Sequence, residues 1–204
     1  MKAPAGVAAL LALAGCGPKT VATGGAAWPP APAGASLAAK VVWDFEHATL
    51  AGQAQFASLF DFAEVGAFEI LLHRYDVIGR AELSDARRAA LAAEAPAPYP
   101  AAREQRNVSR YYPRWVQRTV GTGGCAGQAP RLEYNQLMGR PFEPLPPEHA
   151  HFDALRTRVN AQLEGGGVIA VRCRGGKGGL ALVYSPRPTA RGYDLITIYD
   201  DGEE

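Results

Sequence analysis

Apolar residues recur at steps of three and four along several stretches of the chain, which is the pattern of amphipathic helices. The series is clearest over residues 53–78, where we expect one helical face that is divided into two helices at Gly66. Residues 41–45 are densely apolar and fit either a strand or the first helix of the domain, and we favour the helix. The folded part is therefore expected to begin near Leu37.

Two later helices have start or stop signals. Ser84 precedes a helix predicted over residues 85–93, where its hydroxyl can cap the first turn and Asp85 lies at the positive end of the dipole. Apolar residues from Phe152 to Leu163 follow a helical period, and the run ends at three glycines at 165–167. We expect helices over both stretches.

Three strands are predicted after these helices. Residues 168–174, 180–185 and 193–199 are rich in β-branched and aromatic side chains, and the segments between them are rich in glycine and proline. The fold class is therefore α+β, with helices packed on one face of an antiparallel C-terminal meander sheet. This order of elements is compatible with the nuclear-transport-factor-like superfold, as an analogy of fold without a shared motif.

The middle of the chain, residues 95–147, contains nine prolines and five glycines, so long regular elements are not expected there. A short strand over residues 132–137 and a broken helix or extended segment over 107–120 are predicted. The many aromatic residues of this part argue against disorder.

The first residues form a secretory signal. Lys2 precedes a charge-free apolar run over residues 5–14, which is too short to cross a bilayer, and Leu13-Ala14-Gly15-Cys16 follows. This string resembles the lipobox of bacterial lipoproteins. The resemblance implies cleavage before Cys16, acylation of Cys16 and a lipid anchor. The alternative is an ordinary signal peptide with an incidental cysteine.

The same resemblance gives a domain plan. Residues 1–15 are expected to be a signal peptide, residues 16–36 a lipidated, proline-rich tether, and residues 37–204 a single domain. Gly17 follows the lipobox cysteine where an aspartate would signal retention at the inner membrane, so we expect an outer-membrane anchor with the domain facing the periplasm.

Composition excludes two classes of protein. A hydrophobic content of 48% with 20% charged residues is unlike a wholly disordered chain. Lys and Arg number 21 against 20 for Asp and Glu, and loss of residues 1–15 removes only Lys2, so the balance excludes a strongly basic nucleic-acid binder.

Apart from Cys16, the cysteines are Cys125 and Cys173. Two cysteines in an exported chain usually pair, so we expect a disulfide that ties the proline-rich middle to the first C-terminal strand. The alternation of that strand places Cys173 with Ile169 and Val171, which predicts a buried bond. A catalytic thiol is the alternative, but neither cysteine has a nucleophile signature.

Five arginines recur at steps of three and four among aromatic residues: Arg103, Arg106, Arg110, Arg114 and Arg118. On a continuous helix they would form a stripe able to bind phosphate or carboxylate groups of a lipid headgroup or envelope glycan. Pro113 interrupts the stripe, and the alternative is a solvated face without a ligand.

Other candidates have simpler interpretations. His149 and His151 are two residues apart and are expected to be polar residues at a helix start, so no metal and no cofactor are predicted. The sequence Gly175–Gly179 lacks the features of a phosphate loop and is expected to be a hairpin turn.

Taken together, the chain is expected to be a non-catalytic binding or structural module of the envelope, with an anionic envelope component or a protein as partner. The alternative is a small-molecule-binding or hydrolytic domain with a pocket between helices and sheet. Acid–base residues for that alternative would come from this set: Asp44, Glu46, His47, Asp61, Glu64, Glu69 and His73.

Overall fold

The computed structural model describes residues 28–79, 83–94, 101–110, 112–121, 123–129 and 141–200. The predicted signal peptide, Cys16 and the predicted strand over 132–137 lie outside these residues. No helix in the described ranges is long and apolar enough to span a membrane.

Helices precede most of the sheet along the chain, as expected for an α+β fold. The helices are α1 (Leu37–Ala51), α2 (Gln53–Ala57), α3 (Phe62–Gly79), α4 (Asp85–Ala93), α5 (Ala101–Arg110), α6 (Tyr112–Val120), the 3-10 helix η1 (Pro147–Phe152) and α8 (Asp153–Gly165). The strands are β1 (Gly123–Gln128), β2 (Gly167–Arg174), β3 (Gly179–Pro186) and β4 (Tyr193–Asp200).

The four strands form one antiparallel sheet in the order β1-β2-β3-β4. The predicted meander of β2, β3 and β4 is confirmed, and the Gly175–Gly178 segment forms the turn between β2 and β3. Strand β1 was not predicted, because its glycines and alanine carry no strand signal.

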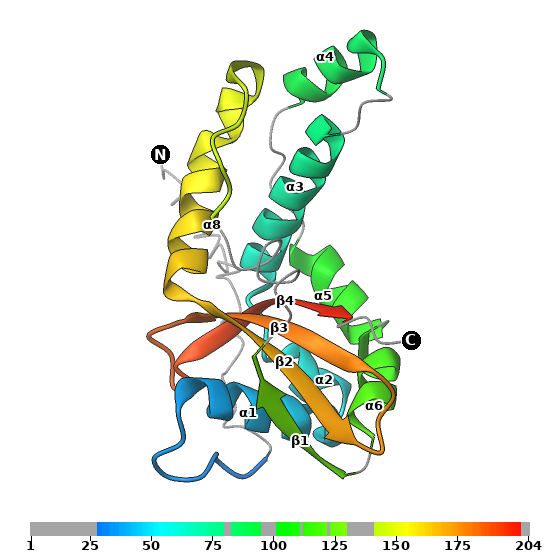
Figure 1. Ribbon diagram of the computed structural model, residues 1–204, viewed down its shortest axis with the longest axis vertical. Coiled ribbons are helices and arrows are strands. Elements are labelled where there is room, and N and C mark those ends of the chain that lie inside the picture. The colour runs from blue at the N-terminus through cyan, green and yellow to red at the C-terminus, as the bar shows by residue number, and fades with distance from the viewer. Residues whose placement is uncertain are drawn as a thin grey trace, which may run out of the picture.

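Helices cover both faces of the sheet, which corrects the prediction of helices on one face (Figure 1). One core joins α1 and α2 to side chains such as Leu180, Leu182 and Leu195. A second core joins α3 and α8 to Val183 and Ile196 on the opposite face. The reason is visible in β3, where consecutive apolar residues are all buried and both faces therefore need a cover.

The break between α2 and α3 lies before Phe62 and not at Gly66, which is a buried residue inside α3. Asp61 Oδ1 accepts hydrogen bonds from the backbone N–H groups of Ala63 (3.1 Å) and Glu64 (3.4 Å). Asp61 therefore caps α3, and a side-chain cap decides the boundary more strongly than one glycine does.

Helix α4 spans the predicted residues, and Ser84 Oγ accepts from the Arg87 N–H at 3.3 Å as expected of an N-cap. The buried Arg74 holds α4 against α3 by donating to Leu91 O at 2.7 Å and to Glu94 Oε2 at 3.2 Å. Its guanidinium also lies 4.5 Å from the centre of the Phe152 ring, at the end of η1.

Packing begins before Leu37, within the segment predicted as tether. Helix α1 begins at Leu37, but Trp28 is 8% exposed and belongs to the same core as α1. Its indole Nε1 donates to Asp44 Oδ1 at 3.0 Å, and the Trp43 indole donates to Pro29 O at 2.9 Å. Residues 28–36, called the arm below, are thus held against α1.

Candidate functional site

The predicted disulfide between Cys125 and Cys173 is present, with Cα atoms 4.0 Å apart on paired strands β1 and β2. The bond is half-buried, which corrects the prediction of a buried one. Strand β1 is the outer strand of the sheet, so one side of the bond faces a hollow of about 330 Å³ beside α1. Glu46 Oε2 accepts the outward N–H of Cys125 at 3.0 Å.

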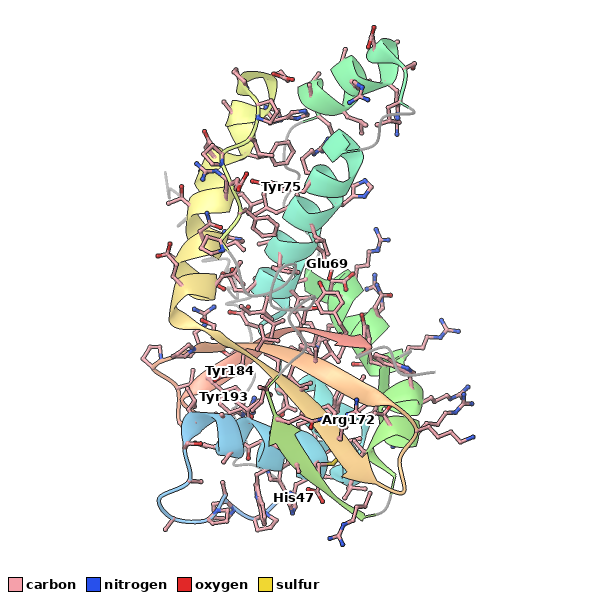
Figure 2. All side chains as sticks on the ribbon, viewed as in Figure 1. His47, Glu69, Tyr75, Arg172, Tyr184 and Tyr193 are labelled. Atoms are coloured by element: carbon pink, nitrogen blue, oxygen red, sulfur yellow. A yellow bond between two sulfur atoms is a disulfide. The ribbon has the colours of Figure 1, made fainter. Side chains whose placement is uncertain are left out.

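The five predicted arginines lie on two consecutive helices and all have exposed side chains. We call them the arginine row: Arg103, Arg106 and Arg110 on α5, and Arg114 and Arg118 on α6. Nitrogen-tipped side chains project outward along both helices at the right of Figure 2. Pro113 is the second residue of α6, where its missing N–H costs no helical hydrogen bond.

The inner faces of α5 and α6 fix the row on the domain. Val108, Val116 and Val120 are buried in the core shared with α1 and the sheet. The turn between β2 and β3 packs on the end of α6, where the Lys177 N–H donates to Arg118 O at 3.1 Å. Lys177 is exposed and adds a positive charge at this end of the row.

Most of the row lacks internal charge partners. Within the described residues Arg103, Arg106, Arg114 and Arg118 form no ion pair. Arg106 and Arg110 also line a hollow of about 440 Å³ together with Gln53, Asn107 and Ser109. Every residue of this hollow is polar, and guanidinium, amide and hydroxyl groups are all hydrogen-bond donors.

The aromatic residues near the row serve the core and not an outer stacking surface. Tyr112 and Trp115 are half-buried, with ring centroids 6.0 Å apart in an edge-to-face arrangement, and both pack against the core under α6. Arginines and aromatics therefore separate onto different sides of α6, which the spacing alone did not reveal.

Two acids lie near the row, the buried Glu104 on α5 and the half-buried Glu69 on α3. Burial raises the pKa of Glu69, the nearby Glu104 raises it further, and a hydrogen bond from Thr197 lowers it. Burial likewise raises the pKa values of Tyr112 and Tyr199, with Glu69 as the next cause. The Glu104 carboxylate already has a donor, because its Oε1 accepts from Asn107 Nδ2 at 2.9 Å.

Other acid–base candidates are occupied by structural contacts. Asp44 accepts from Trp28 and, through Oδ2, from the Tyr193 hydroxyl at 3.0 Å. His47 Nδ1 lies 2.8 Å from Trp43 O and its ring stacks on the Trp43 indole. Asp61 caps α3 and Glu64 Oε2 lies 3.5 Å from Arg158 Nε, so these residues do not converge on one site.

His149 and His151 lie in η1, before α8. His149 is buried; burial lowers its pKa and Arg74 lowers it further. A ring nitrogen of His151, Nε2, lies 2.8 Å from Glu94 O. Among the described residues no group of three or more potential ligands could hold a metal ion.

A third hollow lies between the arm and the loop that joins β3 to β4. It has a volume of about 550 Å³ and is lined by residues such as Lys40, Ser58 and Arg191. Lys40 and Arg191 are 151 residues apart, so no sequence spacing connects them. The signal that could have found this site is Trp28, an isolated aromatic residue in a proline-rich segment.

No family model matches the chain, and no curated protein or solved structure matches it. The nuclear-transport-factor-like analogy therefore stays a prediction.

Proposed function

We propose that the protein is an outer-membrane lipoprotein, anchored by an acylated Cys16, whose periplasmic domain binds an anionic component of the envelope through the arginine row. The observation that carries this proposal is the hollow beside Arg106 and Arg110, because every residue that lines it has a polar side chain. A phosphate or carboxylate can accept hydrogen bonds from both guanidinium groups there.

Charge and exposure support the proposal. The chain as a whole is almost neutral, so five exposed arginines on two adjoining helices are a local concentration of positive charge. Leu50 is the only exposed large hydrophobic residue among those described. The binding mode is therefore electrostatic contact with a surface, without insertion of apolar side chains.

The anchor also limits the choice of ligand. Eleven residues lie between Cys16 and Trp28, and an extended chain spans at most about 3.6 Å per residue, so Trp28 stays within roughly 40 Å of the bilayer. Phosphates of lipid headgroups or of glycans on that membrane are thus the candidates, and not a distant polymer.

The anchor is tested by mass spectrometry of the protein from the membrane fraction. We expect a mature chain that begins at an acylated Cys16, and the Cys16→Ser variant should be released or remain unprocessed. An intact Met1 terminus or an unmodified soluble product would contradict the lipoprotein assignment.

Anion binding is tested by sedimenting the Cys16→Ser protein with phosphatidylglycerol vesicles and, separately, with phosphatidylcholine vesicles. Each arginine near an anionic surface contributes about 1 kcal/mol, so Arg114→Gln should weaken binding roughly fivefold. Arg106→Gln combined with Arg114→Gln should weaken it about 30-fold. Binding should also fall as salt is raised.

The matched control is Arg87→Gln, which removes one exposed arginine from α4. This variant should bind like the unchanged protein. Equal losses for Arg87 and Arg114 would show that only net charge matters, and equal binding to both kinds of vesicle would refute the proposal for lipid phosphates. A phosphorylated glycan is then tested as the second candidate ligand, with the same variants.

A further inference from the structure

The hollow under the arm has two walls from distant parts of the chain. The arm contributes Trp28, Pro30 and Pro32, and the loop between β3 and β4 contributes Thr189, Ala190 and Arg191. Both segments lie at the left of the view, near α1 and the labelled Tyr193 (Figures 1 and 2). A volume of about 550 Å³ is in the range of small-molecule sites.

Two cations meet at this hollow and are held by oxygens that carry no full charge. Lys40 Nζ donates to Arg191 O at 2.5 Å. Arg191 Nη1 donates to Ser58 O at 2.5 Å, and Nη2 lies 3.4 Å from Ser58 Oγ. In the part of the chain that the structure describes, neither Lys40 nor Arg191 forms an ion pair.

The two carboxylates that line the same hollow already have donors. Asp44 is buried, and its two oxygens accept from Trp28 and from Tyr193. Asp194 Oδ2 lies 3.7 Å from Arg187 Nε. Burial raises the pKa of Asp194, and the neighbouring Asp61 raises it further, while Arg191 and Arg187 lower it. The donors that remain for a ligand are thus mainly those of the two cations.

Lys40 uses one of its three N–H donors on Arg191 O, and Arg191 has N–H donors besides those directed at Ser58. A carboxylate or phosphate placed between them would receive charge-assisted hydrogen bonds from both. The side chains of the prolines and alanines in the walls carry no donors, and they suit an apolar body attached to such a head.

We infer that this hollow, called the arm pocket below, binds a small amphiphilic anion, with its carboxylate or phosphate head between Lys40 and Arg191 and its apolar body against the arm. The site is separate from the arginine row, which lies on α5 and α6. The inference therefore does not rest on the proposed function.

Isothermal titration of the folded Cys16→Ser protein tests the inference with defined probes. Octanoate and octyl phosphate supply the two heads on a free amphiphile, and dihexanoyl phosphatidylglycerol supplies the phosphate as a lipid headgroup. At least one of the three probes should bind. The probe that binds most tightly shows whether the natural head group is a carboxylate, a phosphate on a free amphiphile or the phosphate of a lipid. Octyltrimethylammonium, which reverses the charge, should not bind at this site.

Variants separate the arm pocket from general adsorption. Lys40→Gln should lower the affinity about tenfold or more, because a charge-assisted hydrogen bond is lost, and Lys40→Arg should retain it. Arg191→Gln should have a similar effect, while Arg87→Gln on α4 should leave the affinity unchanged. The Lys40→Arg variant keeps the test valid if Lys40→Gln also loosens the loop.

Three results would overturn the inference. The first is that none of the three probes binds, and the second is that affinity is equal in Lys40→Gln and the unchanged protein. The third is that inorganic phosphate binds as tightly as octyl phosphate, because the apolar walls would then contribute nothing. None of these results bears on vesicle binding by the arginine row.

Discussion

Trp28 is expected to stabilise the domain although it precedes the first helix by nine residues. Its indole is 8% exposed, packs in the core with α1, and donates a hydrogen bond of 3.0 Å to the buried carboxylate of Asp44. Two substitutions separate these contributions. Trp28→Phe keeps most of the buried ring and removes the donor, whereas Trp28→Ala removes both.

The expected magnitudes follow from these contacts. Loss of a hydrogen bond to a buried charged group costs about 1.5–3 kcal/mol, so Trp28→Phe should lower the free energy of unfolding by about 2 kcal/mol. Truncation of a buried tryptophan costs about 3–5 kcal/mol through lost burial and the cavity left behind, so Trp28→Ala should be clearly worse.

Equilibrium unfolding in urea measures these differences, and two further variants give the comparison. Trp115→Phe is the matched control, because the half-buried Trp115 forms no indole hydrogen bond within the described residues. In an Asp44→Ala background Trp28→Phe should cost little, because the acceptor is gone. If Trp28→Phe is as stable as the unchanged protein, the arm is not held by the bond to Asp44.

Three other predictions concern the disulfide, the β2–β3 turn and a half-buried acid. Reduction of the Cys125–Cys173 bond, which closes a 48-residue separation, should lower the free energy of unfolding by about 4 kcal/mol, and urea unfolding with and without reductant measures this. Gly176→Ala should cost roughly 1–3 kcal/mol, because the added methyl group would overlap Thr119 O, while Gly165→Ala meets no atom and should be neutral in the same assay. Glu69→Gln should stabilise at pH 8 and have little effect near pH 4, because a raised carboxyl pKa adds stability below about 4.5 that is lost as pH rises through the folded-state value. Denaturation at several pH values checks this, and a constant difference would contradict it.

Much of the fold follows from local sequence signals. Ser84 and Asp85 mark the start of α4, and the β-branched and aromatic runs mark β2 to β4, because caps and alternation act over a few residues. Strand β1 has no such signal and depends on its partner β2. Gly127 of β1 lets the strand pack closely on α1 and β2, since a methyl group there would lie 2.8 Å from Val42 and 3.0 Å from Ile169.

The candidate sites were predictable to different degrees. The spacing of the arginines placed them on one exposed side, because helical periodicity is a local property. The hollow beside Arg106 and Arg110 needed the position of Gln53 on α2, which no periodicity reveals. For the arm pocket the sequence offers only the isolated Trp28, because Lys40 and Arg191 meet only after α1 and the β3–β4 loop have packed together.

The arm links the proposed anchor to the arm pocket. Under cleavage before Cys16, the chain runs from the acylated terminus to Trp28 and then along one wall of the hollow. A ligand that contacts the docked arm stabilises the docked state, and by linkage the docked arm stabilises the bound ligand by the same free energy. A substitution that undocks the arm should therefore weaken ligand binding. Trp28→Ala should therefore reduce probe affinity even though the Lys40 and Arg191 side chains are unchanged. It should leave the arginine row as it was, because the row is fixed by the buried valines of α5 and α6 and not by the arm.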